Sequence, residues 1–161
     1  MPDKIELGGY YPGAIGHITA LHAEYYAAVW GFDRTFEIQV AEELADFISS
    51  FREGRDGLWT YETAGSIAID GREAFERGAR LRWFIVESTC CGSGLGRRLL
   101  RSSFEFCREA GYPGIYLWTF EGLDRARKLY EKTGFRLSVE KRVKRWGRFI
   151  NEQKFELDLR R

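Results

Sequence analysis

A short glycine-rich stretch holds the residues of this chain whose types and spacing could do chemistry. Residues 87–100, ESTCCGSGLGRRLL, place glycines at three alternate positions, with two cysteines before them and Arg97 and Arg98 after them. Glycine lets a ligand approach the backbone, and the free N–H groups at the start of a helix attract phosphate. The stretch therefore predicts an anion cradle made by the amides of residues 92–97, with a purely structural tight turn as the alternative.

Two familiar phosphate-binding devices do not fit this stretch. A P-loop requires Lys followed by Ser or Thr after its last glycine, and Arg97 and Arg98 stand there instead. A dinucleotide-binding fold requires G-x-G-x-x-G after its first strand and an acidic residue about 20 positions later, and neither the spacing nor the place in the chain agrees. Nucleoside triphosphate hydrolysis and dinucleotide binding are both excluded.

The cysteines do not indicate a metal centre. Cys90 and Cys91 are adjacent, Cys107 lies at an apolar position of a predicted helix, and His17 and His22 are far upstream. A zinc site needs four ligands, typically with a C-x-x-C pair, so we expect no metal. Cys107 is expected in the core, and Cys91 at a helix start could be reactive.

Composition points to one globular domain covering residues 1–161. The 25 basic and 24 acidic residues give a net charge of +1, so no overall field would attract nucleic acid or an anionic membrane. No apolar run is long enough to span a bilayer, and three cysteines form no disulfide framework, which together favour a cytoplasmic protein. The basic run 141–148, KRVKRWGR, is expected to be a solvated loop or a wall of a cleft.

Hydrophobic periodicity predicts an α/β fold with a mixed sheet and helices on its faces. Apolar runs such as RLRWFIV indicate strands buried on both faces, and Asp124 is expected to cap the last helix. The predicted helices cover residues 13–30, 40–48, 94–110 and 124–133, and the predicted strands cover 58–61, 66–70, 80–86, 114–119, 135–140 and 153–159.

Two motifs in the right order resemble those of the GNAT (Gcn5-related) N-acetyltransferases. The segment FIVESTCCGSGLGRRLL resembles their acetyl-CoA motif, [Q/R]-x-x-G-x-[G/A], with Gly94 and Gly96 at the small positions. Downstream, A-x-x-L-Y-E-K-x-G-F runs from Ala126 to Phe135. The stretches GHITALHAEYYAAVWGF and GSIAIDG also resemble a subgroup that is otherwise fused to MarR-type regulators.

The resemblance implies a central sheet with two splayed parallel strands that hold the arm of acetyl-CoA, the cosubstrate. It implies Tyr130 as the general acid that protonates the coenzyme A sulfur, and a backbone N–H at Val86 or its neighbour that polarises the thioester carbonyl. Cys91 stands where relatives carry Gln or Arg, and Leu123 where an Asn is often found. The implied cofactor-binding residues are Phe84, Ile85, Val86, Cys91, Gly92, Ser93, Gly94, Leu95, Gly96, Arg97 and Arg127.

The expected activity is transfer of the acetyl group to a primary amine of a small molecule or protein by direct attack in a ternary complex. Glu121 is the first candidate for the base, beside Glu87, His22 and Glu24. The resemblance implies that residues 15–51 and 143–150 set the acceptor, and dimers are common among relatives. The aromatic side chains that could line an acceptor pocket are Tyr25, Tyr26, Trp30, Trp83 and Trp118. The alternative is a non-catalytic acyl-CoA-binding sensor or interaction module.

Overall fold

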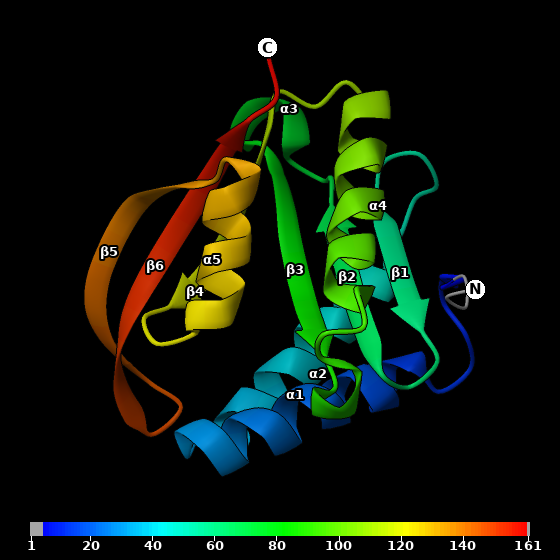
Figure 1. The fold of residues 1–161 in the computed structure, drawn as a ribbon. Coiled ribbons are helices and arrows are strands. Elements are labelled where there is room, and N and C mark those ends of the chain that lie inside the picture. Colours follow the sequence, from blue (N-terminus) through cyan, green and yellow to red (C-terminus); the bar gives the residue numbers. More distant parts are fainter. Residues whose placement is uncertain (1–4, 161) are drawn as a thin grey trace.

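The chain folds around one six-stranded mixed sheet whose strand order is β1-β2-β3-β4-β6-β5 (Figure 1). This computed structural model describes residues 5–160. The strands are β1 Gly57–Tyr61, β2 Gly65–Asp70, β3 Ala79–Val86, β4 Gly114–Phe120, β5 Arg136–Arg145 and β6 Arg148–Asp158. The helices are α1 Ala14–Trp30, α2 Arg34–Ser49, α3 Ala74–Arg77, α4 Leu95–Glu109 and α5 Asp124–Thr133, with a 3-10 turn η1 at Ser88–Cys90.

Helices cover the sheet on both faces, which confirms the predicted α/β class. On one face α4 and α5 lie side by side in front of the sheet (Figure 1), and Leu99 and Cys107 of α4 are completely buried there with Ile115 of β4. On the other face, Ile18 of α1 and Leu44 of α2 pack with apolar side chains of β1 and β2. Burial raises the pKa of the Cys107 thiol to about 12, as a core position dictates.

The parallel strands β3 and β4 separate after a short contact, as the family resemblance implied. They pair only at Ala79 with Ile115 and at Arg80 with Tyr116, although β3 runs on to Val86 and β4 to Phe120. Beyond this contact each strand keeps hydrogen bonds only on its outer side, to β2 and to β6. The sheet therefore contains an open gap between its two central strands.

A bulge in β3 lies beside this gap. The register with β2 shifts between Ser66 and Ala68, and Trp83 takes a positive φ of 47°. Such a backbone is costly for a bulky residue and usually marks a place where a strand re-aims its side chains. Here the Ser66 hydroxyl donates to the Trp83 carbonyl at 2.7 Å, and the Arg82 guanidinium lies 4.2 Å from the Trp83 ring.

The C-terminal hairpin corrects two expectations. The basic run 141–148 is wrong as a loop: it belongs to strands β5 and β6, which turn at Trp146 and Gly147 with φ of 55° and 81°. Alternating long cationic side chains suit an exposed edge strand, which is why the segment extends there. Asp124 is also wrong as a helix cap, because α5 begins at Asp124 and Leu123 precedes it without a side-chain capping bond.

Candidate active site

The inner edge of β3 offers backbone groups to the gap. The Glu87 N–H donates to the Ala64 carbonyl at 2.7 Å, so β3 turns that side toward β2. Because successive residues of a strand point their N–H and C=O groups to opposite sides, those of Val86, and of Phe84 two positions earlier, face the gap instead. An extended ligand lying in the gap can therefore pair with β3 at Phe84 and Val86.

The glycine turn leaves a set of amides free at the end of this gap. Gly92 and Gly94 have φ of 84° and 89°, and a Cβ built on either would meet no atom within 4 Å. Arg98 donates to the Gly94 carbonyl and opens α4. No acceptor within residues 5–160 bonds the N–H groups of Gly92, Gly94, Gly96 or Arg97. This geometry supports the proposed phosphate cradle.

Other residues expected at the turn have internal partners. The amides of Cys91 and Ser93 donate to the Ser88 and Cys90 carbonyls, and the Leu95 amide lies 3.3 Å from the Ser93 hydroxyl oxygen. The Leu95 side chain is buried in the core. Ile85 pairs with Ser66 of β2. These four residues shape the cradle, whereas the free donors lie at the glycines and Arg97.

Tyr130 lies on the α5 side of the gap. Its ring is buried and packs among aromatic rings, with centroids 6.2 Å from Phe84 and 5.7 Å from Phe135. No hydrogen bond to its hydroxyl is present in the described part of the chain. Burial, and secondarily the phenol of Tyr26 on α1, raises the pKa of Tyr130. The phenol therefore keeps its proton at neutral pH, as a proton donor must.

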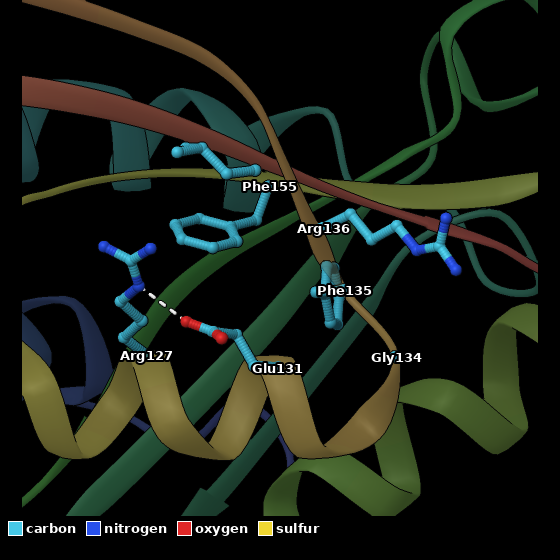
Figure 2. Close-up of a pocket in the computed structure, with 7 residues that line it drawn as sticks. Arg127, Glu131, Gly134, Phe135, Arg136 and Phe155 are labelled. Atoms are coloured by element: carbon cyan, nitrogen blue, oxygen red, sulfur yellow. Dashed lines mark hydrogen bonds and ion pairs between the residues drawn. The ribbon is translucent and has the colours of Figure 1, made fainter.

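Arg127 is not brought to the glycine turn. It lies on the side of α5 away from Leu129, the residue that would touch a side chain at Gly96. Figure 2 shows Arg127 in a different pocket of about 450 Å³, with its Nε donating to Glu131 Oε1 at 2.6 Å. Its guanidinium also lies 5.6 Å from the Phe155 ring. A role for Arg127 in binding the cofactor would need this ion pair to break.

Glu121 follows β4 and is exposed. Its Oε2 accepts a hydrogen bond from Asn151 Nδ2 at 2.9 Å. Asn151 lies on the same face of β6 as Phe155, which packs under α5. The Glu121 carboxylate is thus held on the α5 face of the sheet, with Tyr130.

Aromatic rings pack together on the other face of the gap. We call this cluster the aromatic floor; its members are Tyr26, Phe32, Phe36, Phe120 and Trp146. The Tyr26 ring lies 5.8 Å from Phe120 of β4 and 5.7 Å from Phe32, and Trp146 of the hairpin turn packs at 4.9 Å from Phe32. The Trp146 indole donates to Gln39 Oε1 of α2. The segments expected to set the acceptor, 15–51 and 143–150, contain Phe32, Phe36 and Trp146 without singling them out, and Phe120 was not anticipated at all. These four carry no motif, and only the packing of distant segments brings them together.

The remaining base candidates differ in burial. Glu24 and Glu87 are exposed, whereas His22 is 6% exposed and its Nδ1 donates to the Ile18 carbonyl at 2.8 Å. Within the described residues, no group of three or more His, Cys, Asp or Glu side chains could hold a metal ion. Over the same residues, no helix has the length and apolarity needed to cross a membrane.

Comparison with known proteins identifies the family. The profile of the Acetyltransferase (GNAT) family matches residues 16–135, and the chain therefore belongs to that family. N-acetyltransferase 8B of Homo sapiens is 22% identical over 152 residues, which cover 89% of this chain and 67% of that protein. The name of that protein agrees with the family's activity.

Solved structures share the fold. An acetyltransferase of the GNAT family from Staphylococcus aureus MU50 has a TM-score of 0.75 at 16% identity, covering 98% of this chain and all of that one. The structure of yncA from Salmonella typhimurium, with its cofactor acetyl-CoA, has a TM-score of 0.71 at 14% identity, covering 99% and 96%. The protein is thus an N-acetyltransferase of the GNAT family whose cosubstrate is acetyl-CoA.

Proposed function

We propose that this protein transfers the acetyl group of acetyl-CoA to a primary amine by direct attack in a ternary complex. The observation that carries the proposal is the gap between β3 and β4, which has free backbone donors at one end and Tyr130 on its wall. Direct attack suits such a gap because one site can hold both reactants together, which removes the entropic cost of a bimolecular encounter.

The residues present fit acetyl-CoA. The free amides of Gly92, Gly94, Gly96 and Arg97 and the positive end of α4 suit a pyrophosphate. The inward backbone groups of Phe84 and Val86 suit the amides of the pantetheine arm, which would lie as an added strand. The Val86 N–H, or that of Phe84, is the proposed donor to the thioester carbonyl oxygen.

Proton transfers complete the chemistry. Tyr130 donates its phenolic proton to the sulfur as the C–S bond breaks, since a thiol leaves more easily than a thiolate. The attacking nitrogen must lose one proton in turn. We propose two candidates for the group that takes it, Glu121 and His22.

The acceptor is proposed to enter over the aromatic floor and the hairpin turn, where α1, α2 and residues 143–150 meet. The proposal includes a place in the MarR-fused subgroup, based on the likeness of residues 16–32 and 65–71, and a homodimer. Spermidine N-acetyltransferase SpeG of Vibrio cholerae, which has a TM-score of 0.68 at 17% identity, shares the fold and acts on an amine, as its name states.

The deciding experiment mixes the protein and acetyl-CoA with a panel of polyamines, amino acids, aminoglycosides and peptide N-termini, and follows release of the free thiol. We expect thiol release with at least one amine class, together with a matching acetylated product in a mass spectrum. Tight binding of acetyl-CoA by calorimetry with no turnover across the panel would support the sensor alternative instead.

A further inference from the structure

One face of α1 carries four polar side chains, and two of them have buried polar atoms without a hydrogen-bonding partner among residues 5–160. Thr19, His22, Tyr26 and Trp30 follow each other at three- and four-residue steps and so share one side of the helix. Thr19 Oγ1 and Trp30 Nε1 are buried without a partner, and no bond reaches the Tyr26 hydroxyl from residues 5–160. Buried polar atoms in native proteins are nearly always paired, so the two unpaired atoms at Thr19 and Trp30 indicate room for water or a ligand along this face.

This face of α1 crosses the sheet at the gap. Ile18 packs in one cluster with Ala68 of β2, whereas the Tyr26 ring lies against Phe120 of β4. Since β3 lies between β2 and β4, His22, one turn from each of these contacts, lies over the end of β3 and the gap beside it. Figure 1 shows α1 crossing the sheet at the end toward which β3 points.

The hydrogen bonding of His22 sets its tautomer. Because Nδ1 donates to the Ile18 carbonyl, the proton of the neutral ring is on Nδ1 and the Nε2 lone pair is free. The ring stacks 6.3 Å from Tyr26. Burial lowers the pKa of His22 to about 4, and the Ile18 bond opposes that shift only partly; no charged group of the described residues contributes. The titratable groups that face this region are Tyr26 on α1 and Tyr130 on α5.

We propose that His22 Nε2 accepts the proton that the amine loses during acetyl transfer, an inference that rests on the proposed function. The amine lone pair forms the C–N bond, the C–S bond breaks with its electron pair leaving on sulfur, and Tyr130 gives that sulfur a proton. His22 takes one proton from the nitrogen. The imidazolium then releases its proton to solvent and the Tyr130 phenolate regains one, so both residues return to their starting states.

The basicity of His22 dictates when it acts. A free ammonium has a pKa near 10.4, about six pH units above that of His22, so His22 cannot deprotonate the resting substrate. The nitrogen becomes much more acidic once its lone pair is committed to the C–N bond. His22 therefore takes the proton as that bond forms, from an amine that enters the site uncharged.

The position of Glu121 argues against it as the base. Asn151 holds its carboxylate on the α5 face, the face that also carries the proton donor Tyr130. His22 lies on the opposite face, with the aromatic floor where the acceptor is proposed to enter. With Tyr130 and His22 on opposite faces, Tyr130 can protonate the sulfur and His22 can take the proton of the amine nitrogen. The two side chains then do not exchange a proton directly.

The test compares variants at three positions. His22→Asn keeps a donor for the Ile18 carbonyl but removes the Nε2 lone pair. We expect kcat to fall about 100-fold, within the usual range for general base catalysis, while the Kd for acetyl-CoA changes less than about twofold. The ratio of its rate to the wild-type rate at the same pH should also rise about tenfold per pH unit, because hydroxide must replace the imidazole. His17→Gln, at the exposed start of α1, is the control and should keep the wild-type rate.

The outcomes separate the two proposals. An unchanged kcat for His22→Asn beside an active wild type overturns the role of His22 alone, and a matching loss in Glu121→Gln instead would transfer the role to that carboxylate. No turnover by the wild type with any amine overturns the proposed function and this inference with it. Independently of activity, nitrogen NMR of the imidazole should show the proton on Nδ1, and a proton on Nε2 would overturn the inference directly.

Discussion

The two sides of the gap between β3 and β4 are built in different ways. On the α4 and α5 side, the site consists of backbone amides at a glycine turn and one tyrosine on a helix, all within some forty residues of sequence. On the α1 side, it consists of side chains from α1, α2, β4 and the β5–β6 turn, which are up to about 120 residues apart. The α4 and α5 side is thus formed mainly by backbone groups that are close in the sequence. The α1 side is formed by side chains from distant segments that the fold brings together.

This difference explains what each side can recognise. Backbone donors at fixed φ bind the same phosphate and amide groups whatever the neighbouring side chains are. An aromatic floor changes its shape with every substitution, so the same fold can serve many amines. We therefore expect substitutions on the α4 and α5 side to act on acetyl-CoA and chemistry, and those on the α1 side to act on the acceptor and the base.

The largest effect should come from Tyr130→Phe. Loss of the phenolic proton should lower kcat by about 100-fold or more while the Kd for acetyl-CoA stays nearly the same, since the ring keeps its contacts. Tyr112→Phe is the matched control, because the Tyr112 hydroxyl donates to the Arg55 carbonyl at 2.6 Å, away from the gap. That variant should lose about 1 kcal/mol of stability and no activity. Steady-state kinetics showing full kcat for Tyr130→Phe would remove it from the mechanism.

The α1 side should respond to pH through the stability of the fold. His22 has a pKa near 4 when folded and about 6.5 when unfolded, so acid favours the unfolded chain. The contribution of the neutral His22 ring to the free energy of unfolding is complete above pH 6.5 and is lost as the pH falls toward 4. Urea unfolding of the wild type should lose about 2 to 3 kcal/mol from this group between pH 7.5 and pH 4.5. Between these two pH values, the free energy of unfolding of His22→Gln should fall by about 2 to 3 kcal/mol less than that of the wild type. An equal fall in the two proteins would contradict the burial of a neutral His22 ring.

Valine substitutions at the glycines on either end of α4 can distinguish an effect of backbone strain from an effect on acetyl-CoA binding. Gly94 and Gly111 both have positive φ, 89° and 76°, and both face open space. Valine at either should cost about 1 to 2 kcal/mol of unfolding free energy because of the left-handed backbone. Only Gly94→Val should also weaken acetyl-CoA binding, by about tenfold or more, as measured by calorimetry. Equal affinity in both variants would show that the cradle lies elsewhere.

The smallest effect is expected for Cys91→Ala. The Cys91 side chain is exposed, and the free donors of the turn belong to the glycines and Arg97. Acetyl-CoA affinity should therefore change less than about twofold. A tenfold loss would mean that the thiol itself contacts the cofactor, and the cradle would then depend on a side chain as well as on its backbone.

Sequence patterns predicted the secondary structure around the glycine turn well because its determinants are local. The strand before the turn, the glycines and the start of α4 follow from periodicity and φ requirements within twenty residues. The first half of β5 was predicted from the alternation of Leu137 and Val139, but its continuation to Arg145 was missed because residues 141–145 contain four cationic side chains and only one apolar one. The aromatic floor was missed because Phe120 and Trp146 meet Phe32 only through the fold.

Arg127 shows a second limit. Its place in a family motif suggested the cofactor, but rotation along α5 points it toward Phe155 and Glu131. A motif fixes positions along the chain and leaves the helix face to be decided by packing. Tyr130, three positions further on, lies on the same side of α5 and also contacts the Phe155 ring, at 6.3 Å, but its ring is buried in the core.

The short contact between β3 and β4 divides the hydrogen bonding of the sheet into two three-stranded halves that are joined at one end. In the described residues, only the pairs Ala79–Ile115 and Arg80–Tyr116 join the halves through the backbone, whereas elsewhere they are held by side-chain packing. Amide protons of Phe84 and Val86 should then exchange rapidly with deuterium, and a bound pantetheine arm would slow them by acting as a seventh strand. Under the proposed function, the cosubstrate would then also connect the two halves of the sheet through backbone hydrogen bonds.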